Sequence, residues 1–153
     1  MIPEMEECAN ILDGIKDEIL DTIRGLDEAA LNWTPLSTEI TNSIYSLVVH
    51  ICGSEAQMIH HLVGGLQINR DRDAEFRASG KSVAELEAVM KNASKTTREV
   101  LESLNPEQLT EERDSGLWGM FTVRKAILRQ IHHQALHLGQ VQLTKQVYEA
   151  SIS

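Results

Sequence analysis

The chain has 153 residues, 42% of them hydrophobic, and its 14 basic and 23 acidic side chains give a formal net charge of −9. This length fits a single domain, residues 1–153, which can bury enough surface to be stable without cross-links. The acidic balance and the lack of a basic stripe argue against a nucleic-acid partner, because phosphate binding requires concentrated positive charge.

The sequence also argues against a membrane-spanning protein and against a secreted one. No apolar run approaches the roughly 18 residues of a membrane span. Residues 1–7 are acidic and lack the basic and apolar regions of a secretory signal. We therefore expect no membrane association and a cytoplasmic location, in which Cys8 and Cys52 are reduced, buried side chains.

Helical spacing of the apolar residues predicts four helices. Their expected ranges are 3–25, 41–63, 82–106 and 122–148. Pro3 suits a first helical turn, and either Thr41 or Asn42 can cap the second helix. Ser82 and Glu85 form a capping box at the start of the third, and Thr122 is a natural cap for the fourth.

Three polar segments, 27–39, 67–81 and 105–121, are expected to be loops between these helices. The run from Arg70 to Asp73 alternates in charge and indicates solvated surface. No segment alternates like a strand for long enough to build a sheet. The sequence therefore predicts an all-α fold, a four-helix bundle with long crossover loops.

Two histidines, His133 and His137, lie four residues apart in the fourth predicted helix, so both imidazoles share one face. Such a pair also arises by chance on solvated faces or in cores. Around this pair, however, the face is small, apolar or uncharged, as an interior site requires. His50, in the middle of the second predicted helix, is the best candidate for a third ligand. Three histidines would hold a tetrahedral ion with one position open.

Other polar residues are predicted around the three histidines. Ser54, Gln57 and Gln130 are candidates to support the ligands or line a pocket, although plain packing explains Ser54 and Gln57 equally well. His61 is expected at most at the pocket mouth. His60 is expected at the surface, and His132, about 100° from its neighbour, is expected to be structural or at the surface.

Three neutral imidazoles leave the charge of a divalent ion uncompensated. The catalytic group is then a metal-bound water with a pKa near 7, or a substrate thiol bound as thiolate. The run from His133 to His137 differs by one residue from the His-Glu-x-x-His of zinc proteases. Because Gln134 cannot take a proton from water, a protease of that type is disfavoured.

Three motifs, taken in order along the chain, point to a known family. They are Leu-Asn-Trp-x-Pro at 31–35, Ser43-Ile44 followed by His50-Ile51 and Glu55, and His133-x-x-x-His137-x-Gly139-Gln140. Together they resemble the DinB/YfiT-like family (the DinB superfamily). The resemblance implies a four-helix bundle whose divalent metal, often nickel or zinc, is held by three histidines, here His50, His133 and His137.

The same resemblance implies frequent homodimers, and characterised relatives include thiol S-transferases and isomerases that use low-molecular-weight thiols. Two positions depart from the common pattern. Leu138 stands where many members have Arg, and Asn42 where many have Trp. Neither change removes a proposed ligand, but both weaken any carry-over of substrate contacts.

The sequence therefore predicts a metal-dependent enzyme acting on a small molecule, thiol S-transferase-like or hydrolase-like. One divalent ion is expected, nickel or zinc before iron or manganese. The alternative is a non-catalytic metal-binding protein of stress response or interaction. Three ligands and an open position would favour catalysis, since inert structural zinc sites normally use four protein ligands.

A second apolar stripe on the fourth predicted helix, Ile127, Ile131, Ala135 and Leu138, lies opposite the ligand face. Because a helix in a monomeric bundle normally has one apolar stripe, this pattern predicts a homodimer with Ile131 near the interface centre. The alternative is that the first helix or the connector around Trp33 covers the stripe within the same chain.

Overall fold

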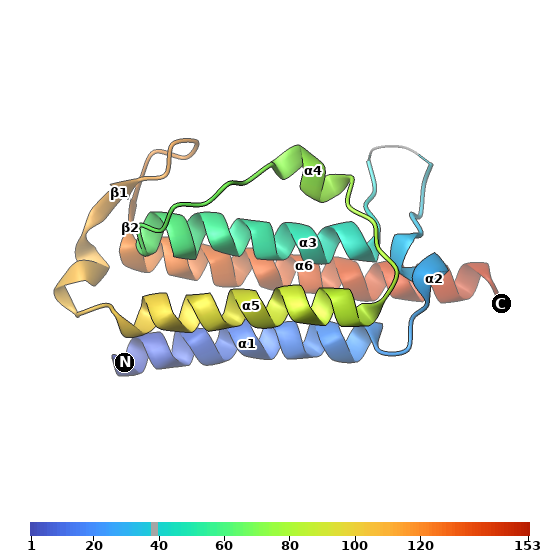
Figure 1. Cartoon of the computed structure of the whole chain (residues 1–153), viewed down its shortest axis with the longest axis horizontal. Coiled ribbons are helices and arrows are strands. Elements are labelled where there is room, and N and C mark those ends of the chain that lie inside the picture. Colours follow the sequence, from blue (N-terminus) through green and yellow to red (C-terminus); the bar gives the residue numbers. More distant parts are fainter. Residues whose placement is uncertain (38–39) are drawn as a thin grey trace.

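The computed structural model describes residues 1–37 and 40–153, and four long helical segments form its body (Figure 1). They are α1 (Pro3–Ile23), α3 (Ile44–Glu55) continued by the π-helical segment η1 (Ala56–Val63), α5 (Val83–Glu102) and α6 (Val123–Ser151). Helices α1 and α3 each pack against both α5 and α6. The predicted all-α four-helix bundle is thereby confirmed.

Side-chain caps set the starts of three of these helices. The hydroxyls of Ser82 and Thr122 accept hydrogen bonds from backbone N–H groups three residues on, as predicted. The second predicted helix begins later than expected, because its N-cap is Ser43 rather than Thr41 or Asn42.

The predicted loops contain short elements that sequence patterning did not reveal. They are α2 (Glu28–Asn32), α4 (Arg72–Phe76), the 3₁₀ turn η2 (Glu107–Thr110), and strands β1 (Glu112–Asp114) and β2 (Met120–Thr122). The strands pair antiparallel in a hairpin with Arg113 opposite Phe121. Three residues a strand are too few to show an alternating pattern. Residues 38–39, at the end of the first predicted loop, lie outside the described residues.

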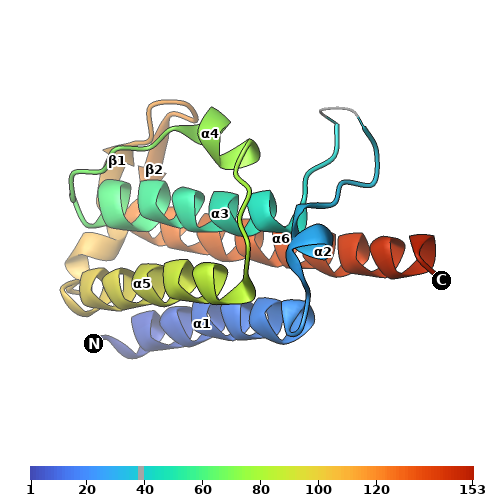
Figure 2. The ribbon, with the colours of Figure 1, turned by 45° about the vertical axis from the view of Figure 1, so that its right-hand side comes forward.

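The segment between η1 and α5 runs back along the length of the bundle. Figures 1 and 2 show it leaving the hairpin end, passing over the outer side of α3 and reaching the start of α5 at the other end. This path follows from α3 and α5 pointing the same way. Helix α4 is carried by this crossover and packs on α3. Asp71, Arg72 and Asp73 are exposed, as predicted for solvated surface, whereas Arg70 is only partly exposed.

A cluster of hydrogen-bonded polar side chains lies in the interior and includes at least one residue from each long helical segment. Lys16 Nζ donates to Glu55 Oε1 (2.9 Å), which also accepts from the Thr97 hydroxyl (2.6 Å). Gln134 Nε2 donates to Glu55 Oε2 (2.7 Å). His60 Nε2 lies 3.0 Å from Thr97 Oγ1. The prediction that His60 is at the surface is wrong, since it is 8% exposed.

The second apolar stripe of α6 is mostly covered by the chain itself. Ile127 and Leu138 belong to the two core clusters, to which α1 contributes residues along its length, and Ile131 packs against both clusters. Ala135 is exposed. The alternative, that the first helix covers the stripe within the same chain, therefore describes the structure. The stripe is no longer an argument for a homodimer.

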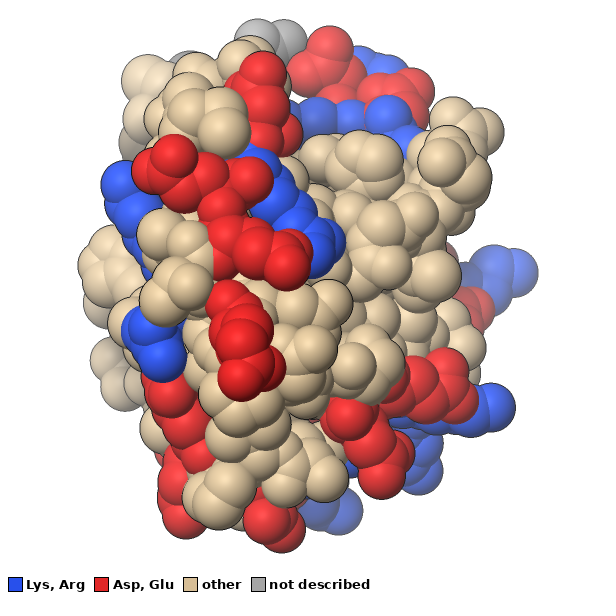
Figure 3. All heavy atoms as spheres, turned by 90° about the vertical axis from the view of Figure 1, so that its left-hand side faces the viewer, with Lys and Arg blue, Asp and Glu red and all other residues tan. Residues whose placement is uncertain are grey.

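The charged residues show no concentration of one sign at the hairpin end of the bundle. In Figure 3, acidic and basic side chains both occur on that face, beside an area of uncharged side chains. Within the described ranges, none of the helices has the length and apolar character needed to cross a membrane.

Candidate metal centre

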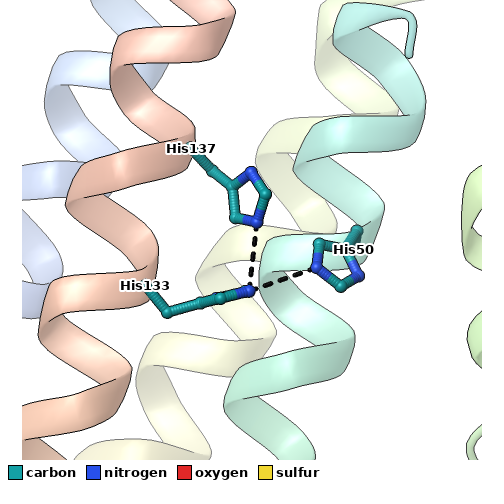
Figure 4. A group of neighbouring side chains, drawn as sticks. All are labelled: His50, His133 and His137. Carbon is teal, nitrogen blue, oxygen red and sulfur yellow. Dashed lines mark hydrogen bonds between the residues drawn. The ribbon is translucent and has the colours of Figure 1, made fainter. Parts of the chain in front are cut away.

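The three predicted histidines converge between α3 and α6. His50 comes from α3, and His133 and His137 come from successive turns of α6 (Figure 4). The Nε2 atom of His133 lies 3.2 Å from Nε2 of His50 and 3.0 Å from Nε2 of His137. One ligand atom from each residue lies within 4.8 Å of the other two. The arrangement is compatible with a metal site.

Neighbouring side chains fix the tautomers of two of these rings. His50 Nδ1 lies 3.0 Å from Glu75 Oε1, and His137 Nδ1 lies 2.6 Å from Gln140 Oε1. Both oxygens are acceptors, so each ring carries its proton on Nδ1 and directs the Nε2 lone pair to the centre.

This donor set fits a divalent ion better than it fits hydrogen bonding among the rings. His133 Nε2 can donate one proton at most, so one of its two short contacts would oppose two lone pairs. A tetrahedral ion with Zn–N bonds of about 2.0–2.1 Å separates its ligand atoms by about 3.3–3.4 Å, close to both contacts. The tautomers of His50 and His137 leave their two Nε2 lone pairs available to the ion, and His133 adds a third when its proton lies on Nδ1.

Glu75, from the crossover, is a site residue that the sequence did not indicate. It is 7% exposed and accepts from His50, while Arg70 donates to both of its oxygens at 2.8 and 2.9 Å. Burial would raise the pKa of Glu75, but the hydrogen bonds from His50 and Arg70 outweigh it and hold that pKa below its usual value. A carboxylate on the far nitrogen of a ligand histidine orients the ring and increases its basicity.

Gly53 is the position that lets Glu75 approach. A Cβ built there would lie 1.8 Å from Glu75 Oε2, so any larger residue would displace the carboxylate. Glycine inside a helix costs about 1 kcal/mol relative to alanine. A glycine three residues after a candidate ligand was therefore the one signal in the sequence that something approaches α3 closely at this point.

We expect Gly53→Ala and Glu75→Gln to weaken metal binding about 10- to 100-fold, the range found for groups that orient ligands. Competition titration with a chromogenic chelator measures this affinity. Gly14→Ala is the matched control, because a Cβ there meets none of the described atoms within 4 Å. Equal affinities for Gly53→Ala and Gly14→Ala would contradict the assigned role of Glu75.

Two of the three predicted supporting residues lie beside the centre. Ser54 donates to Gln130 Oε1 at 3.0 Å, and both line a pocket of about 230 Å³ together with His50 and His133. Gln57 is half-buried and is not among the described residues that line this pocket. His132 is exposed, as expected, and His61 Nδ1 lies 2.9 Å from the Leu66 carbonyl at the end of η1.

Burial keeps His133 and His137 neutral. Desolvation, followed by the charges that His137 and His50 would carry, lowers the pKa of His133 to about 3. Desolvation also lowers the pKa of His137. Neutral imidazole is the form that binds a metal, so the ligands are ready at neutral pH.

The metal-free protein should lose stability on acidification from pH 6.5 toward pH 3. The pKa of His133 is about 3 in the folded state against an ordinary 6.5. In that window the unfolded chain binds more protons, so stability rises with pH and levels off above 6.5. Thermal unfolding of chelator-treated protein measures the slope. His133→Asn should flatten the slope between pH 5 and 6.5, and an unchanged slope would contradict the assignment.

Comparison with known proteins identifies the family. The profile of the DinB superfamily matches residues 11–141, so the chain belongs to the DinB superfamily, a metal-associated family. The fold is similar to that of a conserved protein from Enterococcus faecalis (TM-score 0.75, 15% identity, covering 96% of this chain and 98% of that one). It is also similar to that of a DinB-like protein from Bacillus subtilis (TM-score 0.63, 21% identity, 93% and 92%). Curated protein sequences give no significant match.

Proposed function

We propose that this protein is a metal-dependent enzyme that acts on a small molecule, with a low-molecular-weight thiol as the first candidate substrate. His50, His133 and His137 would hold one divalent ion, nickel or zinc before iron or manganese. The proposal is supported by one observation above all. Three Nε2 atoms with fixed or available lone pairs meet beside a pocket that Ser54 and Gln130 also line.

Residues around the histidines would prepare the site for such a reaction. Glu75 and Gln140 orient two of the ligands, and the three neutral rings leave the positive charge of an ion uncompensated. A divalent ion so held lowers the pKa of a thiol or water bound next to it. In the transfer, the thiol gives its proton to solvent and its sulfur bonds to the acceptor carbon. The bond between that carbon and the leaving group breaks, and the leaving group departs with the electron pair.

Experiment can distinguish this proposal from two alternative functions. A hydrolase-like enzyme would use water in place of the thiol at the same centre. A non-catalytic metal-binding protein of stress response or interaction would bind the ion without turnover. The three-histidine cluster beside a pocket favours catalysis, because inert structural zinc sites normally have four protein ligands.

Metal analysis of purified protein, followed by a thiol screen, tests the proposal. We expect metal-loaded protein to consume a glutathione-like thiol in the presence of an alkylating acceptor, and His133→Ala not to. Turnover of esters without thiol would instead support the hydrolase. Stoichiometric metal with no turnover of either kind would support the non-catalytic protein.

A cytoplasmic location accords with thiol chemistry. Cys8 and Cys52 are both free and buried. Burial raises the pKa of the Cys52 thiol to about 12, so it remains protonated and unreactive. We propose the cytoplasm, where low-molecular-weight thiols are kept reduced, as the place of action.

We also propose a homodimer, now on a different face of α6. Leu128, Leu136 and Leu143 are 51–59% exposed and, at 100° per residue, lie within about 80° of one another. With Val147, which is 40% exposed, they make a row of exposed apolar side chains on the solvent-facing side of α6. A second copy meeting this row would form an isologous interface.

Leu136→Glu should convert the dimer to monomer, because it sets a carboxylate in each copy against an apolar surface. Sedimentation at micromolar concentration measures the state. Val89→Glu, at a 41% exposed position of α5, is the control that should leave the dimer intact. A parent protein that is monomeric at this concentration would remove the proposal.

A further inference from the structure

The pocket beside the histidine cluster is positively charged, although the chain as a whole is acidic. Arg70, Arg72 and Arg129 line it, and none of its described lining residues is acidic. Arg70 is neutralised by Glu75. Arg72 and Arg129 form no ion pair within the part of the chain that the structure describes. Two uncompensated guanidinium groups therefore face the pocket in a chain whose formal net charge is −9.

Aromatic rings hold both guanidinium groups in place. Arg72 Cζ lies 4.9 Å from the centroid of the Phe76 ring, which itself lies 4.4 Å from the His50 ring. Arg129 Cζ lies 4.6 Å from the centroid of Trp118, in the hairpin turn. Stacking on a ring face leaves the N–H groups in the guanidinium plane free, in the geometry that matches a carboxylate.

The wall of the pocket adds a further donor. Gln130 is fully buried, and its Oε1 accepts from Ser54. Its Nε2 has no hydrogen-bond partner among the described residues. A buried donor without a partner is unfavourable, and a ligand oxygen would satisfy it. Apart from the Nε2 lone pairs directed at the ion, the free polar groups described here, the Arg72 and Arg129 guanidinium groups and Gln130 Nε2, are thus donors.

We propose that this pocket binds the carboxylate of a small acidic substrate and so places the neighbouring atoms at the histidine cluster. The inference rests on the proposed function and narrows it to a thiol or acceptor that carries a carboxylate near its reacting atom. A volume of about 230 Å³ lies below the roughly 300–1,000 Å³ of pockets for drug-sized ligands, so the substrate is small.

Calorimetry with matched acids and amides tests this. Metal-loaded protein is titrated with 3-mercaptopropionate and with 3-mercaptopropanamide, and metal-free protein with propionate and propionamide. We expect each acid to bind about tenfold or more tightly than its amide, because charge-assisted hydrogen bonds are roughly twice as strong as neutral ones. The double variant Arg72→Gln/Arg129→Gln should lose this preference and keep its metal content, and Arg129→Lys in place of Arg129→Gln should restore part of it.

Arg124→Gln is the matched control, since Arg124 lies on α6 but pairs with Glu4 at the surface. Equal binding of acid and amide by the parent, or an unchanged preference in the double variant, would overturn the inference. The metal-free titrations keep the two proposals separate. A protein that binds no metal fails the proposed function, whereas the preference for propionate over propionamide still decides the carboxylate site.

Discussion

Purified protein should contain about one divalent ion per chain, and replacing any one of His50, His133 or His137 with alanine should bring that content toward zero. Each of these residues directs an Nε2 atom to the same point, with contacts of 3.0 and 3.2 Å. Removing a ligand should lower the metal affinity by more than the roughly 10- to 100-fold expected for removing a group that orients a ligand. Elemental analysis after gel filtration measures the stoichiometry.

Thermal unfolding gives an independent readout. An ion at a hundred times its Kd stabilises the folded state by about 2.7 kcal/mol, which corresponds to roughly 5–11 °C in Tm for a chain of this size. Added metal should produce this increase in the parent and not in the alanine variants. His132→Ala, at the exposed neighbour of His133, should behave as the parent does. Loss of the ion from that variant, or full metal content in His50→Ala and His133→Ala, would show that the ligands are other residues.

The long helices and the histidine cluster could be predicted because both leave local periodic signals. The spacing of His133 and His137 fixes their shared face whatever surrounds the helix. The caps Ser82 and Thr122 are likewise local, because each bonds a backbone group three residues away. His50 could be added because it lies mid-helix on a face of small residues.

Residues on the crossover could not be predicted in the same way. Arg70 and Glu75 lie in a stretch of mixed charge that has the composition of a solvated loop. Only its path over α3 buries Glu75 and leaves the Arg70 side chain 15% exposed. That path is set by the direction of α5 relative to α3, which no local pattern records. His60 was misplaced for a related reason. Its partner Thr97 is 37 residues away, on a different helix.

The buried ion pair between Lys16 and Glu55 is expected to contribute strongly to the stability of the fold. The side chains of Lys16 and Glu55 are 3% and 0% exposed, and Glu55 also accepts from Thr97 and Gln134. Removing one partner of a buried pair leaves an uncompensated charge and typically costs about 3–5 kcal/mol. We expect Lys16→Met to lower the free energy of unfolding by this amount in urea titrations.

Two comparisons separate the effect of the lost charge on stability from the effect of the changed side-chain shape. Lys91→Met makes the same substitution in an exposed pair with Glu87, where side chains are 72% and 42% exposed, and should cost less than about 1 kcal/mol. Adding Glu55→Gln to Lys16→Met should recover much of the loss, because an uncharged amide can still bond Thr97 and Gln134 without a cation beside it. Equal losses for Lys16→Met and Lys91→Met would mean that the pair contributes no more than a surface contact. The recovered stability, by contrast, would identify the unpaired carboxylate as the cause and Glu55 as the residue that ties α1, α3, α5 and α6 together beneath the histidines.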